Sequence, residues 1–274
     1  ALNDADAIEM VNAAEHAGVK TLVGFNYVRN PASQLAREII ASGEIGEGIH
    51  FRGCHNEDYL ADPTTPHDWH TFRETAGAGA LGDLGSHILH MAEYLTGQPI
   101  AQVCGQCQTV IPSRPLANGG GMHPVENDDH AQALLQFANG LIGSIETSRV
   151  AAGRKLGLAY TVTGTKGAIR FDQERMSELK LYQREGPSHR QGFRTLLIGP
   201  DHPDYAAFCP APGHGLGFND PKIIEIRDLI EGLAGHRPLY PDFRQARRVN
   251  ALIDAIEHSH RQGGWVAVDG QPAL

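Results

Sequence analysis

A succession of strand-like segments joined by glycine turns is the feature that most constrains the fold of this chain. The candidate strands are Ile49–Asn56, Ala101–Ile111, Ala131–Ala138, Leu141–Val150, Leu158–Gly164, Ala168–Asp172, Leu179–Tyr182 and Trp265–Val268. Asn139-Gly140 is a typical two-residue hairpin turn, and residues 164–167 predict a second turn. Adjacent hairpins favour antiparallel pairing, so the sequence predicts a large, mainly antiparallel open sheet.

Helical patterns flank and interrupt these strands. They cover Asp4–Ala17, Pro31–Ser42, Gly79–Leu95, Pro221–Ala234 and Asp242–Gln262, with a short buried strand predicted at Thr21–Asn26. Pro31 and Gly43 are residue types that begin and end helices. The fold class is therefore α+β, with helices on one face of the sheet and the other face open.

The segment Gly79–Leu95, GALGDLGSHILHMAEYL, carries the clearest chemical signal. Asp83 and His87 are spaced i, i+4, which predicts that they share one helix face within reach of a common proton. A carboxylate beside a histidine orients the ring and favours its protonated form, an arrangement that suits proton transfer to or from a hydroxyl. The alternative is a helix-capping carboxylate and a half-buried histidine that do no chemistry.

Composition excludes several other functions. A formal net charge of −9 argues against a nucleic-acid or anionic-membrane surface. No apolar run approaches the roughly 18 residues of a membrane helix, so we expect a cytoplasmic protein. Cys104 and Cys107 form a C-x-x-C, but in a strand these side chains point to opposite faces, which favours inert thiols over a redox or zinc site.

Several motifs in order along the chain resemble one family. They are GFNYVRNP at 24–31, SGEIGEG at 42–48, ADPTTPHDWH at 61–70, GALGDLGSH at 79–87, GTKGAIRF at 164–171 and GHGLGFND at 213–220. Their order and spacing, from residue 1 to about 268, resemble the glucose-fructose oxidoreductase / inositol dehydrogenase / rhizopine-catabolism family, Gfo/Idh/MocA. Members of this family join a doubly wound dinucleotide-binding domain to a C-terminal sheet domain, and most oxidise or reduce sugars or cyclitols with NAD or NADP.

The resemblance implies a division of the chain. Residues 1–30 would be the C-terminal remnant of the dinucleotide-binding domain, and residues 31–274 the substrate-binding and oligomerisation domain. One GxGxxG string is present, GAGALG at 77–82, but no predicted strand directly precedes it, so it is not a dinucleotide-binding fingerprint. The family's Glu-Lys-Pro lysine would fall just before Ala1. Residue 1 is not Met, so the chain looks truncated, and by itself we expect it to be inactive.

The resemblance also implies roles for individual residues. Asp83 and His87 would be catalytic, with His87 as the general base or acid. Trp69 and His70 would contact the cofactor, although the family's common Trp-Arg pair is Trp-His here. Segments that match the substrate pocket of the family contain Asn26, Tyr27, Asp58, Arg149 and His214. Structural alternatives are a salt bridge within the sheet for Arg149, a core anchor for Trp69 and a loop position for His214.

Three functions follow from these observations. The first is an NAD(P)-dependent dehydrogenase of a sugar, cyclitol or sugar acid, with the open sheet face packed on a second subunit in a homodimer or homotetramer. The second is a metal-dependent hydrolase or isomerase, because His90 replaces an aspartate of the family and could bind a metal with Asp83 and His87. The third is a non-catalytic ligand-binding or oligomerisation module. The particular sugar, the redox direction and the choice between NAD and NADP stay open.

Overall fold

A nine-stranded sheet forms the body of the molecule in the computed structural model, which describes residues 1–202, 204–207, 209–211 and 213–268. Its strands are β1 (Gly48–Asn56), β2 (Ile100–Gln108), β5 (His130–Phe137), β6 (Ile142–Ser148), β7 (Gly157–Gly164), β8 (Gly167–Asp172), β9 (Glu178–Gln183), β10 (Arg194–Leu197) and β11 (Val266–Ala267). Their order is β10-β9-β8-β7-β1-β6-β5-β2-β11. Residues 269–274, the end of the predicted second domain, lie outside the described residues.

The pairing confirms the predicted mainly antiparallel sheet. Within it, β1 and β6 run parallel, while the other neighbouring strands are antiparallel. The hairpin at Asn139-Gly140 joins β5 to β6, and Gly140 has a φ of 88°, which glycine adopts without steric cost. A second tight turn joins β7 to β8, as predicted.

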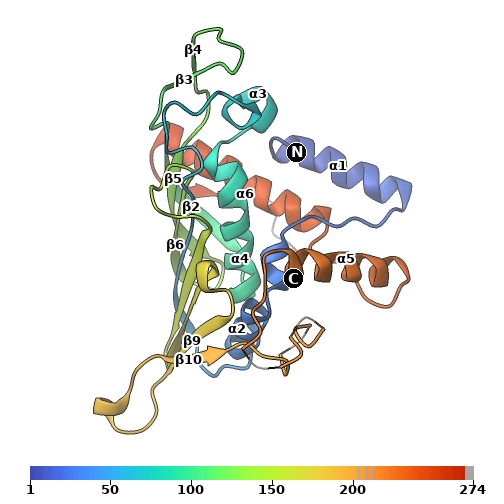
Figure 1. Cartoon of the computed structure of the whole chain (residues 1–274), viewed down its shortest axis with the longest axis vertical. Helices are drawn as coiled ribbons and strands as arrows, with labels where there is room; N and C mark the ends of the chain where they lie inside the picture. Colours follow the sequence, from blue (N-terminus) through green and yellow to red (C-terminus); the bar gives the residue numbers. More distant parts are fainter. Residues whose placement is uncertain (203, 208, 212, 269–274) are drawn as a thin grey trace.

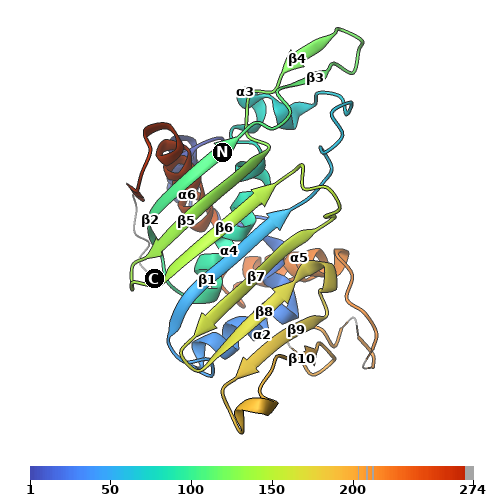
Figure 2. The same cartoon turned by 90° about the vertical axis from the view of Figure 1, so that its left-hand side faces the viewer.

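Helices cover one face of the sheet, and the other face is open (Figures 1 and 2). The layer on the covered face contains α2 (Pro31–Ala41), α4 (Ser86–Thr96) and α6 (Phe243–Gln262), while α1 (Asp4–Ala17) and α5 (Asn219–Leu233) lie farther from the sheet (Figure 1). None of the described helices is long and apolar enough to cross a membrane. Together these elements confirm the α+β fold class.

Gly53 shows how the sheet and the helix layer come close together. A Cβ atom at this position of β1 would lie 2.7 Å from two side-chain carbons of Ile88 on α4. Phe51 and Ile88 are both fully buried at this contact. The missing side chain therefore lets α4 rest directly on β1.

Local signals explain where two helices begin. The Asn30 side chain accepts the Ala32 N–H, with Pro31 as the first helical residue of α2. Asp242 caps α6 in a reciprocal capping box with Gln245. The sequence predicted the first start from Pro31, and the predicted range Asp242–Gln262 begins at the N-cap residue of α6.

The predicted strand at Thr21–Asn26 is wrong. Residues 19–25 are irregular and lead into a 3₁₀ turn, η1 (Asn26–Arg29). A strand is defined by hydrogen bonds to a neighbour, and no described strand runs beside this segment. The Val23 N–H donates instead to the Pro241 carbonyl, at 2.9 Å.

Several short elements were not predicted. They are β3 (Ser113–Pro115), β4 (Met122–Pro124), β10, α3 (Arg73–Ala76), and the 3₁₀ turns η2 (Trp69–Thr71), η4 (Gln173–Arg175) and η5 (Ser188–Arg190). The β3–β4 hairpin projects beyond one end of the large sheet (Figures 1 and 2). Cys104 and Cys107 both lie on β2 as free thiols, and burial raises the pKa of Cys107 to about 12, which keeps it protonated and unreactive.

Candidate active site

The segment predicted as a single helix begins with a π-helical turn, η3 (Leu81–Gly85), before α4 starts. Asp128, just before β5, and Thr147, on β6, hold this start. The Asp128 carboxylate accepts the N–H groups of Gly79 and Leu81 at 2.7 and 2.8 Å, and the Thr147 hydroxyl donates to the Ala80 carbonyl at 3.0 Å. A Cβ on Gly79 would lie 1.9 Å from the Asp128 carbonyl oxygen. The glycine therefore allows the close backbone approach that the motif predicted.

An apolar stripe along this segment is buried in the core. It consists of Leu84, Ile88, Met91, Ala92 and Leu95. These side chains fix the segment against the core, so the polar residues beside them are held on a rigid element. Rigid support of this kind is what a catalytic group needs.

Asp83 and His87 are not paired with each other. Asp83 is exposed, and its carboxylate accepts the Tyr59 hydroxyl at 2.7 Å. No hydrogen bond or ion pair joins Asp83 to His87 in the described part of the chain. The i, i+4 argument assumed an α-helix, whereas a π turn bonds i to i+5 and so changes the angle between these positions. The π turn is therefore the reason why spacing alone does not pair these two side chains.

His87 lies among aromatic rings. Its ring centroid is 4.9 Å from Tyr27, 5.4 Å from Phe25 and 5.6 Å from His55, each in an edge-on arrangement. Burial, with smaller contributions from the charges of His55 and His90, lowers the pKa of His87 to about 3. The predicted bias toward the protonated form is therefore wrong, and His87 is neutral at neutral pH.

The two nitrogens of His87 have different surroundings. Nδ1 is buried and has no hydrogen-bond partner. Nε2 is not buried in this way, and it makes no hydrogen bond within the described residues. Nε2 is consequently the nitrogen available to a ligand. A neutral, unpaired imidazole can accept or return a proton there.

Asn26 and Tyr27 both lie on η1. Both are buried, and the Asn26 side-chain nitrogen has no hydrogen-bond partner. Burial, together with the charges of Glu57 and Asp83, raises the pKa of the Tyr27 phenol, so its hydroxyl stays protonated and can donate. The structure thus brings Tyr27 into ring contact with His87, and Asn26 precedes Tyr27 in η1.

His55 and Glu57 belong to the site but were not found from the sequence. His55 lies on β1 with 1% of its surface exposed, and its nitrogens face the Leu84 carbonyl and the Glu57 carboxylate. A signal did exist, because alternation along the predicted strand puts residue 55 on the same inward face as Phe51. Nothing in the sequence alone related that face to His87.

Trp69 and His70 form an exposed stack connected to Asp83. Their ring centroids are 3.8 Å apart, and Trp69 is 58% exposed, which excludes the core-anchor alternative. Tyr59 joins the stack to the site, because its ring lies 6.0 Å from His70 while its hydroxyl donates to Asp83. The arrangement leaves one aromatic face open to a ligand.

Arg149 is enclosed by its partners. It is fully buried, and its guanidinium donates to Asp129 at 2.9 Å, to Asn127 at 2.8 Å and to the His70 carbonyl at 2.9 Å. Every one of its three nitrogens is occupied. We therefore interpret Arg149 as a structural residue that supports His70. This agrees with the structural alternative, a salt bridge, and not with the predicted contact to the substrate.

Asp58 and His214 lie on loops. Asp58 forms an ion pair of 2.7 Å with Lys155, and the hydrogen bond from that lysine holds the pKa of Asp58 below its usual range. His214 is exposed, with its Nδ1 bonded to the Ala211 carbonyl at 2.8 Å. The loop of His214 reaches the site through Phe218, whose ring lies 6.5 Å from Tyr27.

His90 does not share a metal site with Asp83 and His87. Its Nε2 bonds to the Tyr240 hydroxyl at 3.1 Å, and its ring stacks on Phe25 at 4.7 Å. Across the described residues, no group of three or more His, Cys, Asp and Glu side chains is placed to hold a metal ion. The predicted metal-binding face is therefore not formed.

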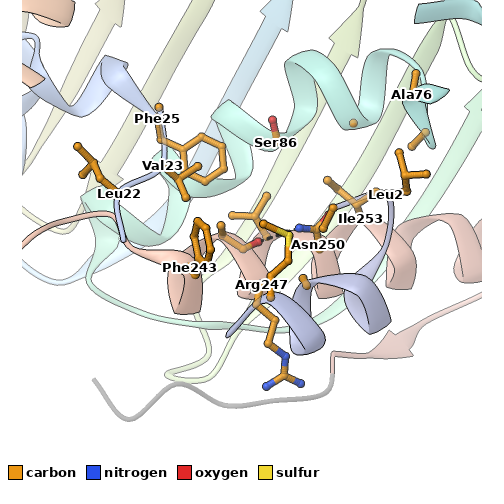
Figure 3. A pocket seen from close by; sticks show the side chains of 18 residues that line it. Leu2, Leu22, Val23, Phe25, Ala76, Ser86, Phe243, Arg247, Asn250 and Ile253 are labelled. Carbon is orange, nitrogen blue, oxygen red and sulfur yellow. Dashed lines mark hydrogen bonds between the residues drawn. The ribbon is translucent and has the colours of Figure 1, made fainter. Parts of the chain in front are cut away.

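A pocket of about 450 Å³ adjoins this site on the side of α1 and α6 (Figure 3). Phe25 lines it and also touches His87, so the pocket and the histidine share a wall. Another wall consists of small residues, which are Ala76, Ala78, Gly82 and Ser86. Small, apolar walls of this kind can accept a flat ring next to His87.

Comparisons with known proteins agree with this geometry. The family described as GFO/IDH/MocA C-terminal domain matches residues 33–170. Levoglucosan dehydrogenase of Pseudarthrobacter phenanthrenivorans is 36% identical over 271 residues, covering 94% of this chain and 69% of the relative. The structure of an NAD binding oxidoreductase from Klebsiella pneumoniae is 41% identical, with a TM-score of 0.93 over 99% of this chain and 72% of that one. Levoglucosan dehydrogenase in complex with NADH and levoglucosan is 37% identical, with a TM-score of 0.94 over 98% and 72%.

Proposed function

Because the chain belongs to the Gfo/Idh/MocA family of oxidoreductases, we propose that it is the substrate-binding portion of an NAD-dependent sugar dehydrogenase. The observation that carries this proposal is His87, a half-buried and neutral histidine whose Nε2 has no described hydrogen-bond partner and whose ring contacts Tyr27. Relatives at 36–37% identity bind NADH, and one structure also holds levoglucosan. These support NAD as the cofactor and an anhydro sugar as the substrate.

The bound cofactor would supply a hydride acceptor for the carbon of a secondary alcohol. The residues of this chain supply the proton chemistry. His87 Nε2 accepts the hydroxyl proton in the oxidative direction and returns it in the reverse direction. The Tyr27 hydroxyl and the Asn26 side-chain nitrogen donate to substrate oxygens, which selects for a polyol because unpaired buried donors penalise an apolar ligand.

The remaining site residues have supporting roles in this proposal. Asp83 fixes Tyr59 at the mouth of the site, next to the exposed stack of Trp69 and His70, which contacts the cofactor. Arg149 holds His70 from behind. Asp58 and His214 lie on loops at the rim, where they would contact the outer part of the substrate.

The proposal includes the division of the chain and its assembly. Residues 1–30 would belong to the dinucleotide-binding domain, and residues 31–274 to the substrate-binding and oligomerisation domain. One face of α5 is apolar and uncovered, because Ile223, Ile226 and Ile230 are each more than half exposed. This face supports the proposal that further structure of the protein packs against α5. The open sheet face would pair with a second subunit.

A substrate panel tests the proposed function. The whole protein that contains this chain is incubated with NAD⁺ and either levoglucosan, L-sorbose, myo-inositol or glucose, and NADH is followed by its absorbance. We expect sugar-dependent NADH formation, fastest with levoglucosan, and much slower reaction with NADP⁺. Folded protein that binds NADH but oxidises none of these alcohols would contradict the proposal.

A further inference from the structure

His55 and Glu57, at the end of β1, form a buried pair that the chemistry proposed above does not use. His55 Nδ1 lies 3.1 Å from the Leu84 carbonyl oxygen, and its Nε2 lies 3.2 Å from a Glu57 carboxylate oxygen. Both partners only accept hydrogen bonds. A neutral imidazole has one N–H, so only the doubly protonated ring can donate to both.

The negative charge of Glu57 would stabilise a doubly protonated His55 ring inside the protein. A buried cation needs a paired anion, and the Glu57 side chain is 19% exposed, so its second oxygen keeps access to water. The His55 ring itself is almost completely enclosed. The pair therefore lies directly against the π turn, with the carboxylate on the side of the ring that faces away from Leu84.

The position of Leu84 links this pair to the site. Leu84 lies in η3, between Asp83 and His87, so the bond to its carbonyl holds the stretch that connects these two residues. Asp128 and Thr147 hold the first residues of the segment, and His55 holds its later part. The same His55 ring lies 5.6 Å from His87 and 5.5 Å from Tyr27.

We propose that His55 is a positioning residue for His87, held as a cation by Glu57, which anchors the π turn and keeps the neighbouring His87 ring uncharged and ready to take a proton. This inference rests on the proposed role of His87 as the proton carrier. A like charge at this distance disfavours a second one, so a charged His55 adds to the effect of burial, which is the larger cause of the lowered pKa of His87.

Other groups around His87 do not provide this positive charge. Tyr27 faces it from η1 as a neutral phenol, and Asp83 and Glu57 are potential anions. His90 follows on α4, but burial, with the charges of Arg29 and Arg37, lowers its own pKa to about 3, so it is neutral near pH 7. Arg29 and Arg37 lower the pKa of His90. Of the two histidines that lower the pKa of His87, His55 contributes more than His90, and its ring contacts the His87 ring.

Imidazole ¹⁵N spectra of the labelled chain, recorded between pH 2.5 and 8, test this directly without substrate or NAD. His87→Gln identifies the His87 signals. We expect wild-type His55 to show two protonated nitrogens at pH 7, and His87 to stay neutral down to pH 5. In His55→Gln, which keeps an amide donor but no charge, the His87 titration midpoint should rise by about one pH unit, a tenfold gain in proton affinity.

Two further variants complete the experiment. His50→Gln, at the other end of the same strand, is the matched control and should leave His87 unchanged. Glu57→Gln should convert His55 to a neutral ring near pH 7, and this variant gives an answer even where His55→Gln does not fold. A neutral His55 in the wild type, or an unmoved His87 midpoint in folded His55→Gln, would overturn the proposal. Neither result would bear on turnover, so failure here is distinct from failure of the proposed function.

Discussion

Two neutral histidines of α4, three residues apart, dominate the chemistry at the scale of single residues. Burial lowers the pKa of both His87 and His90 to about 3, although the two rings have different partners. His87 has an open nitrogen beside Tyr27, whereas His90 is bonded to Tyr240. The first can therefore exchange a proton with a ligand, and the second packs the wall behind it.

These pKa values predict that acid destabilises the fold. In the unfolded chain a histidine titrates near pH 6.5, so below that pH the unfolded state binds more protons and the free energy of unfolding falls. Each ring should lower the free energy of unfolding by about 1.4 kcal/mol as the pH falls from 7.5 to 5.5. In urea unfolding, the free energy of unfolding of His90→Phe should fall by about 1.4 kcal/mol less than that of the wild type over this pH range. The control His16→Gln, at an exposed position, should lose as much stability as the wild type. An unchanged pH dependence in His90→Phe would contradict this account.

At the scale of elements, the glycine-rich start of the site segment is a packing requirement. Gly79→Ala would place a carbon 1.9 Å from the Asp128 carbonyl oxygen, a backbone atom that cannot move aside. We expect a loss of about 3 kcal/mol in the free energy of unfolding, because the segment must shift away from the sheet.

Gly82→Ala is the matched control in the same motif. A Cβ there would meet Ala78 at 3.4 Å, which is an ordinary contact, so this variant should change stability by less than about 1 kcal/mol. Chemical denaturation of the two variants makes the comparison. Equal stability of both would show that Asp128 does not constrain the segment.

The sequence predicted these elements well where one local signal decided them. The Asn139-Gly140 hairpin and the helix starts at Pro31 and Asp242 were confirmed. It failed where structure depends on distant neighbours. Thr21–Asn26 has the composition of a strand, but the ladder needs an adjacent strand, and the π turn depends on Asp128, just before β5, and Thr147, on β6.

The same distinction applies to the site. Asn26, Tyr27 and His87 were placed together by motifs, and the structure brings Tyr27 into ring contact with His87. Arg149 has the same kind of motif signal, yet its partners Asp129 and Asn127 enclose it, which no local pattern reveals. His55 was missed because a single histidine at a strand end has no distinguishing spacing.

At the scale of the whole molecule, the open sheet face carries the proposed assembly. Leu134 and Ile142 point outward from β5 and β6 and are 54% and 57% exposed, on the face seen in Figure 2. Leu134→Asp with Ile142→Asp should convert a homodimer or homotetramer into smaller species in sedimentation velocity. Val19→Asp, on the helix side, should leave the sedimentation coefficient unchanged. A wild-type protein that is monomeric at high concentration would contradict the assembly.

The central claim is that His87 carries the substrate proton, and turnover of His87→Ala in the whole protein tests it most directly. With NAD⁺ and the sugar that the panel identifies, kcat should fall by roughly 10²-fold or more, because a positioned acid or base contributes about that much. The dissociation constant for NADH should change little, which shows that the site is intact. Wild-type turnover in the folded variant would remove His87 from the mechanism and contradict the account.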